Sequence, residues 1–181
     1  FGTDVDLESF ESEIREHEAV KSAEDLPSEV KKAALDVGVK LDDESAGAYV
    51  QMDQTPVVAS SMFEGVEIMD IASALKKYDF LKDYYWKLVA PDADKYTADV
   101  AEAAPSGYFV RARKGTKTVF PIKSCLYLGS TNFNQRVHNI VIAEEGSELH
   151  MITGCTTPSH VQRGLHLGIS EFFIQKNAKV S

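Results

Sequence analysis

The chain has 181 residues, enough to bury a hydrophobic core in one large domain or two small ones. Its 44% hydrophobic and 26% charged residues are ordinary for a folded protein and exclude wholesale disorder. The net charge of −9, without a basic stripe that carries interleaved aromatic residues, argues against a nucleic-acid partner. No apolar run approaches about 18 residues and no basic-then-apolar leader precedes Phe1, so we expect no membrane partner and a cytoplasmic location.

The charge is divided unevenly along the chain. Residues 1–104 hold 24 of the 28 acidic and 10 of the 19 basic residues, a net charge of −14, whereas residues 105–181 carry a net charge of +5. The change falls at Ala104-Pro105-Ser106-Gly107, where Pro, Ser and Gly are typical of a linker. We therefore predict two domains, 1–104 and 105–181.

The acidic half is predicted to be an α+β domain, mainly helical with a small β element. Apolar residues spaced three and four apart predict one helix over 6–20 and a long one that starts after the N-cap Asp70 and covers IASALKKYDFLKDYYWKLV. Pro27 and Gly38 bound another helix, and 94–103 form the last. Short strands are expected at 48–52, 56–59 and 66–69. The aromatic residues 84–86 are expected to pack in the core rather than bind a partner.

The second half is predicted to be mainly β, without a convincing helix. Runs rich in β-branched and aromatic residues predict strands at 108–112, 118–122, 124–128, 137–143, 148–153 and 165–175. Between two of them Gly146 is expected to take positive φ in a tight turn. The segments EEGSEL (144–149) and QKNAKV (175–180) each look like a turn followed by a strand, roughly 30 residues apart. From the residues alone, both a β-solenoid and a β-sandwich remain open.

Two cysteines and four histidines after residue 105 are the candidates for chemistry. Cys155 lies at a strand end beside a polar loop, where a thiol is accessible, so it is the first candidate for sulfur handling, cluster ligation and metal binding. Cys125 is a weaker candidate because it is expected to face a core. His166, His150 and His138 are weak candidates that could turn towards Cys155, but their spacing is not that of a zinc site.

Several motifs together carry a resemblance to a known family. The segments EEGSELHMITGCTTP (144–158) and LHLGISEFFIQKNAKV (165–180) resemble the central region of the SufB/SufD family of iron–sulfur cluster assembly proteins. The corner Gly154-Cys155-Thr156 is similar to the SufB side of that family. Blocks upstream, at 25–27, 51–53, 82–84 and 107–109, are similar to the archaeal-type members, so the resemblance covers nearly the whole chain.

The resemblance implies a fold and a function. The fold would be the first coils of a right-handed parallel β-helix after an N-terminal α+β domain, with a β-sandwich as the alternative. The function would be that of a scaffold subunit, without turnover of its own, that assembles a transient iron–sulfur cluster with a SufC-like ABC-type ATPase and a SufB- or SufD-like paralog. Residues 179–181 supply no helix to cap a solenoid, so we expect an N-terminal part only, with no cluster bound in this fragment. The family's ATPase-binding helices would then follow Ser181.

A different class of function also fits the residues. Cys155 with His166 or His150 would form the nucleophile and base of a thiol-dependent hydrolase. Such an enzyme needs a group that orients the histidine and donors for an oxyanion, and the loop TTPSHVQRG (156–164) offers neither in an obvious way. We therefore favour the scaffold.

Overall fold

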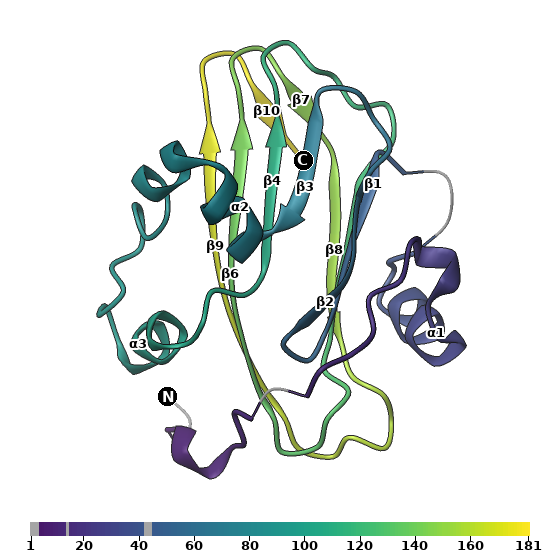
Figure 1. Cartoon of the computed structure of the whole chain (residues 1–181), viewed down its shortest axis with the longest axis vertical. Coiled ribbons are helices and arrows are strands. Elements are labelled where there is room, and N and C mark those ends of the chain that lie inside the picture. The colour runs from purple at the N-terminus through teal and green to yellow at the C-terminus, as the bar shows by residue number, and fades with distance from the viewer. Residues whose placement is uncertain (1–3, 14, 42–44) are drawn as a thin grey trace.

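The computed structural model describes residues 4–13, 15–41 and 45–181, and its strands form two four-stranded sheets that face each other (Figure 1). The first sheet has the order β2 (Thr55–Ser61), β1 (Gly47–Met52), β5 (Ile122–Tyr127), β8 (Met151–Thr156). The second has the order β3 (Val66–Asp70), β4 (Tyr108–Ala112), β6 (Asn134–Ala143), β9 (Leu165–Ile174). A small sheet joins β7 (Glu148–Leu149) and β10 (Lys179–Val180).

From β4 onward the chain passes alternately between the two sheets and lays each strand parallel to the one of the previous circuit. Phe109 pairs with Ile140, which pairs with Glu171, so neighbours in the second sheet are 31 residues apart. In the first sheet Ile122 pairs with Met151, a separation of 29 residues. β2 and β3 are the antiparallel members of their sheets.

Tight turns stack at one end of the sheets with the same spacing. Gly115, Gly146 and Asn177 have φ of +73°, +72° and +58°, the left-handed region that Gly and Asn tolerate best. The turns bond to one another, because Gly115 N donates to Glu145 O and Gly146 N donates to Lys176 O, both at 3.0 Å. The positive φ expected for Gly146 and the loose repeat at 144–149 and 175–180 are confirmed.

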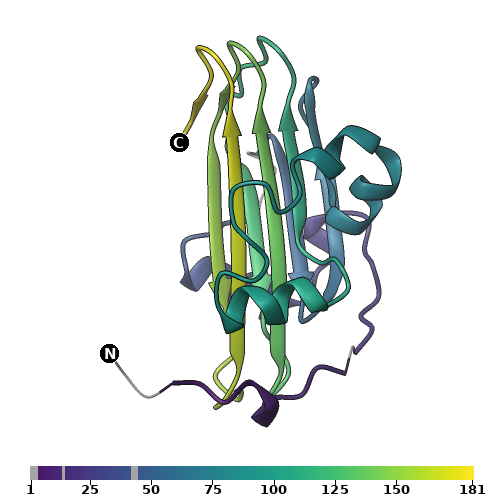
Figure 2. The ribbon, with the colours of Figure 1, turned by 90° about the vertical axis from the view of Figure 1, so that its left-hand side faces the viewer.

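Helices cover the outer faces of both sheets. α1 (Ser28–Asp36) lies on the first sheet, while α2 (Ile71–Lys77) and α3 (Lys95–Glu102) lie on the second (Figure 2). Three hydrophobic clusters follow, one between the sheets around Tyr49, one under α1 around Val50 and one under α2 around Phe109. Among the described helices, none has the length and apolar character needed to cross a membrane.

Most predicted elements are present where the sequence places them. α1 begins directly after Pro27, and the chain turns at Gly38 with a φ of +83°. The carboxylate of Asp70 caps α2 by accepting from Ser73 N at 2.8 Å, and Asp94 caps α3 in the same way. The described strands of the second half match the predicted ones except at 118–122, and residues 107–181 contain no helix.

The helix predicted over 6–20 is wrong. Of its described residues, only the 3₁₀ helix η1 (Leu7–Ser9) is helical, and residue 14 lies outside the described ranges. The backbone bonds elsewhere instead: Glu11 N donates to Asn132 O at 2.7 Å, and Val20 N donates to Val57 O at 2.9 Å. The apolar spacing is that of a helix, but the backbone groups are paired with the neighbouring chain.

Two further predictions need correction. The long helix after Asp70 ends at Lys77 and is followed by the 3₁₀ helix η3 (Asp79–Asp83), and Trp86 has a φ of +58°, which an α-helix does not accommodate. The strand predicted at 118–122 begins only at Ile122. Val119 is 77% exposed and Pro121 has no N–H to donate, so this segment cannot complete a ladder.

The boundary near residue 104 falls between α3 and β4. Strands from both sides of it share each sheet, because β1 pairs with β5 and β3 pairs with β4. The division into domains 1–104 and 105–181 stays a prediction.

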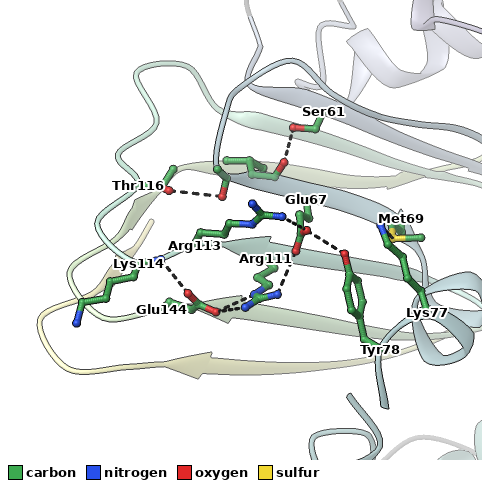
Figure 3. A network of polar contacts seen from close by, with 12 residues as sticks. Ser61, Glu67, Met69, Lys77, Tyr78, Arg111, Arg113, Lys114, Thr116 and Glu144 are labelled. Carbon is green, nitrogen blue, oxygen red and sulfur yellow. Dashed lines mark hydrogen bonds and ion pairs between the residues drawn. The ribbon is translucent and has the colours of Figure 1, made fainter. Parts of the chain in front are cut away.

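A charged network ties β3, β4 and the end of β6 together on the outer face of the second sheet (Figure 3). Glu67 accepts from Arg113 at 2.6 Å, from Arg111 at 3.3 Å and from the Tyr78 hydroxyl at 2.9 Å, and Arg111 also pairs with Glu144. Burial raises the pKa of Glu67, but these donors and charges outweigh it and hold the pKa below its usual value. The network fixes the chain that follows α2 against the sheet.

Candidate functional site

Cys155 lies on β8, the edge strand of the first sheet, and its side chain points between the two sheets. Its partner in register is Leu126, which belongs to the core between the sheets, and residues paired in register share a face. Because β8 has a neighbour on one side only among the described strands, the residue is exposed. The thiol is therefore both oriented by the sheet and open to reactants.

His166 approaches the thiol from the opposite sheet. It lies on β9, and its Nε2 is 3.4 Å from the Cys155 Sγ, a hydrogen-bond distance for sulfur. A pocket of about 220 Å³ surrounds the pair. Its other lining residues are Leu126, Leu128, Gln135, Thr156, Thr157 and Gly164. Of the candidate histidines, His166 is the one that the structure brings to Cys155.

Burial acts on both members of the pair in the direction that keeps them neutral. It raises the pKa of the Cys155 thiol above its usual value and lowers the pKa of the His166 imidazole. No Lys or Arg lines the pocket in the described part of the chain. The site therefore holds a thiol beside a neutral base, rather than a thiolate stabilised by a cation.

Gln135 of β6 orients His166 from behind. Its Oε1 lies 2.7 Å from His166 Nδ1, while its Nε2 donates to Asp53 O at 2.6 Å and to Tyr127 O at 3.3 Å. The amide is fully buried. Sequence reasoning missed this residue, although Gln135 and His166 pair in register and share the 31-residue spacing of the repeat.

Asp53 anchors the turn behind Gln135 and was also missed. It has a φ of +50°, and its Oδ1 accepts from Gly129 N and Ser130 N at 2.8 and 3.0 Å. Its Oδ2 accepts from the Ser130 hydroxyl at 2.6 Å and contacts His17 Nε2 at 3.0 Å. Burial raises the pKa of Asp53, but these four donors together hold it below the usual value. No local motif in the sequence marks this role.

Cys125 lies on the other face of the first sheet. It is fully buried in the cluster under α1, as the sequence predicted, and burial raises the pKa of its thiol to about 12. In register it faces Gly154 rather than Cys155. The two thiols therefore point to opposite faces and do not converge on one site.

His138 and His150 do not turn towards Cys155. His138 lies on the outer face of the second sheet, fully buried, with Nε2 2.7 Å from Glu171 and with its ring against Tyr85 and Trp86 at 4.4 and 4.2 Å. The aromatic residues therefore pack in the core, as expected. His150 follows β7 at the other end of β8 and contacts the Ser181 hydroxyl through Nδ1 at 2.6 Å.

The chemistry available is that of a thiol with a proton acceptor. In residues 4–13, 15–41 and 45–181, no three His, Cys, Asp or Glu side chains are grouped so as to hold a metal ion. A neutral imidazole can accept the thiol proton as the sulfur attacks an electrophile. Soft thiolate sulfur is also a ligand for iron and sulfide.

Comparisons with known proteins identify relatives along the whole chain, although no protein-family model matches it. An iron–sulfur cluster assembly SufBD family protein of Methanothermobacter thermautotrophicus is 46% identical over 187 aligned positions, which cover 100% of this chain and 46% of that protein.

SufBD family proteins of two other archaea also match. That of Archaeoglobus fulgidus is 49% identical over 83% of this chain and 41% of its own length. That of Pyrococcus horikoshii is 31% identical over 90% of this chain and 38% of its own length. This chain belongs to the SufBD family of iron–sulfur cluster assembly proteins, and it spans about half the length of the curated relatives that it matches.

Proposed function

We propose that this chain is the N-terminal part of a SufB-like scaffold subunit on which iron–sulfur clusters are assembled, and that Cys155 handles sulfur there. The observation that carries the proposal is the match, over the entire chain, to proteins named for cluster assembly. The exposed thiol of Cys155 beside His166 is the support from geometry. The corner Gly154-Cys155-Thr156 favours the SufB side over the SufD side.

The fold proposed for the complete protein is a right-handed parallel β-helix, of which the two sheets are the first coils. Parallel pairing at a 31-residue spacing supports it, because each circuit adds one strand to each sheet. A β-sandwich is built from antiparallel strands, and only β2 and β3 pair in that way among the described four-stranded sheets.

The cluster is cargo in this proposal, and the scaffold has no turnover of its own. Cys155, with His166 at its side, offers one soft ligand, so the remaining ligands for iron come from other parts of the complete protein or from a partner. The partners expected from the family resemblance are a SufC-like ATPase and a SufB- or SufD-like paralog, in the cytoplasm.

Anaerobic cluster loading of the complete protein, copurified with its ATPase partner, tests the proposal. Iron and sulfide content and the charge-transfer absorption are compared in the wild type, Cys155→Ser and the buried control Cys125→Ser. We expect the loss of loading in Cys155→Ser and normal loading of the folded Cys125→Ser protein. Normal loading in Cys155→Ser would contradict a role for this thiol in sulfur handling.

A thiol-dependent hydrolase is the second candidate, and one observation favours it. Gln135 supplies the group that orients His166, which the sequence of the 156–164 loop does not. Mixing the protein with an activated ester decides between the two. A burst of one released alcohol per chain that disappears in Cys155→Ser would favour the hydrolase, and the absence of a burst would favour the scaffold.

A further inference from the structure

The side-chain amide of Gln135 has one possible orientation. Its nitrogen faces two backbone carbonyl oxygens, Asp53 O at 2.6 Å and Tyr127 O at 3.3 Å. Turning the amide over would place its oxygen against both carbonyls in a fully buried position, where unpaired acceptors are costly. The amide oxygen must therefore face His166.

This orientation determines where His166 carries its proton. The Gln135 oxygen only accepts, so Nδ1 at 2.7 Å must be the nitrogen that donates. A neutral imidazole has one N–H, which leaves a free lone pair on Nε2. Because Nε2 lies 3.4 Å from the Cys155 Sγ, the thiol donates its hydrogen to that lone pair. Burial lowers the pKa of His166, in agreement with a neutral ring.

A third residue limits where the ring can lie. A Cβ on Gly168, the next residue on the same face of β9, would come within 2.9 Å of His166 Nε2. Glycine at this position leaves the space that the imidazole occupies. The ring is thus held by an acceptor on one side and by the absence of a side chain on the other.

We propose that Gln135 is a positioning residue that holds His166 as the Nδ1–H tautomer, so that Nε2 accepts the Cys155 proton when the sulfur attacks a donor persulfide. The proposal rests on the sulfur-handling function proposed above. The Cys155 sulfur bonds to the outer sulfur of the donor, and the S–S bond of the donor breaks. The electron pair leaves on the inner sulfur, which takes the proton back from Nε2. Cys155 is oxidised to a persulfide and the donor is reduced to a thiol.

The tautomer is measured directly in the complete protein labelled with ¹⁵N-histidine. Long-range ¹H–¹⁵N spectra distinguish a protonated Nδ1 from a protonated Nε2, and the signals of His166 are those lost in His166→Gln. We expect a protonated Nδ1 in the wild type. A protonated Nε2 would overturn the proposal. This measurement involves no sulfur donor and no cluster.

Two substitutions at Gln135 separate tautomer control from anchoring. Both Gln135→Leu and Gln135→Glu lose the donor to Asp53 O and Tyr127 O, but the glutamate keeps an oxygen that accepts from Nδ1–H. We expect the Nδ1–H tautomer to persist in Gln135→Glu and to be lost in Gln135→Leu. The same tautomer in both variants would overturn the role of Gln135. If Gln135→Leu does not fold, the wild-type spectrum and Gln135→Glu decide.

Thiol reactivity gives the functional readout. Alkylation of Cys155 by iodoacetamide, followed by peptide mass spectrometry, should slow about tenfold or more in His166→Gln, as for loss of a general base. It should slow similarly in Gln135→Leu, slow less in Gln135→Glu and stay unchanged in the control His150→Gln. Gly168→Ala, which displaces the ring, should slow it without changing any of the three polar side chains. An unchanged rate in His166→Gln would overturn the proposal.

A low-molecular-weight persulfide then separates this inference from the proposed function. If alkylation depends on His166 and Gln135 but the wild type forms no persulfide on Cys155, the relay stands and the sulfur-handling function is wrong. If persulfide forms equally in the wild type, His166→Gln and Gln135→Leu, the function stands and the relay is wrong.

Discussion

His138 and Glu171 form a buried pair on the outer face of the second sheet, with 2.7 Å between the imidazole Nε2 and a carboxylate oxygen. The same carboxylate accepts from the backbone N–H groups of Trp86 at 3.0 Å, Val89 at 3.1 Å and Leu88. One side chain of β9 thus holds the segment that follows η3 against the sheet. This capture accounts for the early end of the helix that the sequence predicts through residues 71–89.

Replacing Glu171 should destabilise the fold. Glu171→Ala leaves three backbone donors and His138 without their acceptor, and the free energy of unfolding should fall by about 3 kcal/mol or more. Urea unfolding followed by tryptophan fluorescence measures it, because Trp86 lies in the affected segment. The control is Glu145→Ala, whose exposed side chain pairs with Lys114 and should change the free energy by about 0.5 kcal/mol or less. Equal effects would contradict the role of Glu171.

His138 should make stability depend on pH. Burial lowers its pKa in the folded protein, an effect larger than the opposing attraction of Glu171, so the unfolded chain binds the proton more readily. The free energy of unfolding should therefore fall as the pH drops below about 6.5, the value of an unperturbed histidine. In His138→Gln this part of the dependence should be missing. Parallel unfolding curves of the two proteins between neutral and mildly acid pH would show the prediction to be wrong.

Gly154 should not tolerate a side chain. A Cβ at this position would lie 2.8 Å from Val39 Cγ2 and 2.9 Å from Val37 Cγ2, where the chain after α1 packs on β8. Gly154→Ala should lower the free energy of unfolding by about 1–3 kcal/mol through overpacking. The adjacent Thr153→Ala, on the exposed face, is the control and should lie within about 0.5 kcal/mol of the wild type. A melting temperature of Gly154→Ala equal to that of Thr153→Ala would contradict this packing.

Asp53→Asn tests the charge in the turn behind the site. Asparagine tolerates the positive φ of this residue, so the change removes the charge with little backbone strain. The free energy of unfolding should fall by about 1–3 kcal/mol. Because the pKa of Asp53 is held below its usual value, its contribution is present above about pH 4 and is lost as the pH falls through the folded pKa. A difference between the two proteins that stays constant down to pH 2 would contradict the prediction.

The two cysteines should differ in their effect on stability. Cys125→Ser places a hydroxyl in the buried cluster under α1 and should cost about 1–3 kcal/mol, whereas Cys155→Ser, at an exposed position, should change stability by less than about 0.5 kcal/mol. Thermal melts of the two variants measure this. A larger loss in Cys155→Ser would make Cys155 a packing residue.

The parts of the fold that were predictable are those determined by local chemistry. Pro27 and Gly38 bound α1, Asp70 and Asp94 cap their helices, and Gly146 takes the positive φ that its turn requires. The helix predicted over 6–20 failed because its apolar spacing carries no information about Asn132 and Val57, the distant partners of its backbone. Handedness of the winding and the division at residue 104 stay predictions.

The candidate site was predictable only in its exposed half. Cys155 and His166 stand out because thiols and imidazoles are reactive residue types. Gln135 and Asp53 do not, since their role depends on which strand lies beside which. Had the 31-residue register been known, Gln135 would have been placed next to His166.

The unequal spacings of 29 and 31 residues in the two sheets have a consequence for how the protein can vary. The connection from β8 to β9, residues 157–164, has eight residues, against six at 128–133 in the circuit before, yet the strands on either side keep their pairing. Insertions are therefore absorbed at this end of the winding without a frameshift in the sheets. Thr157 and Gly164 of this loop line the pocket of Cys155. Relatives can thus remodel the entrance to the thiol by changing loop length, while the residues that hold the thiol in place stay in register.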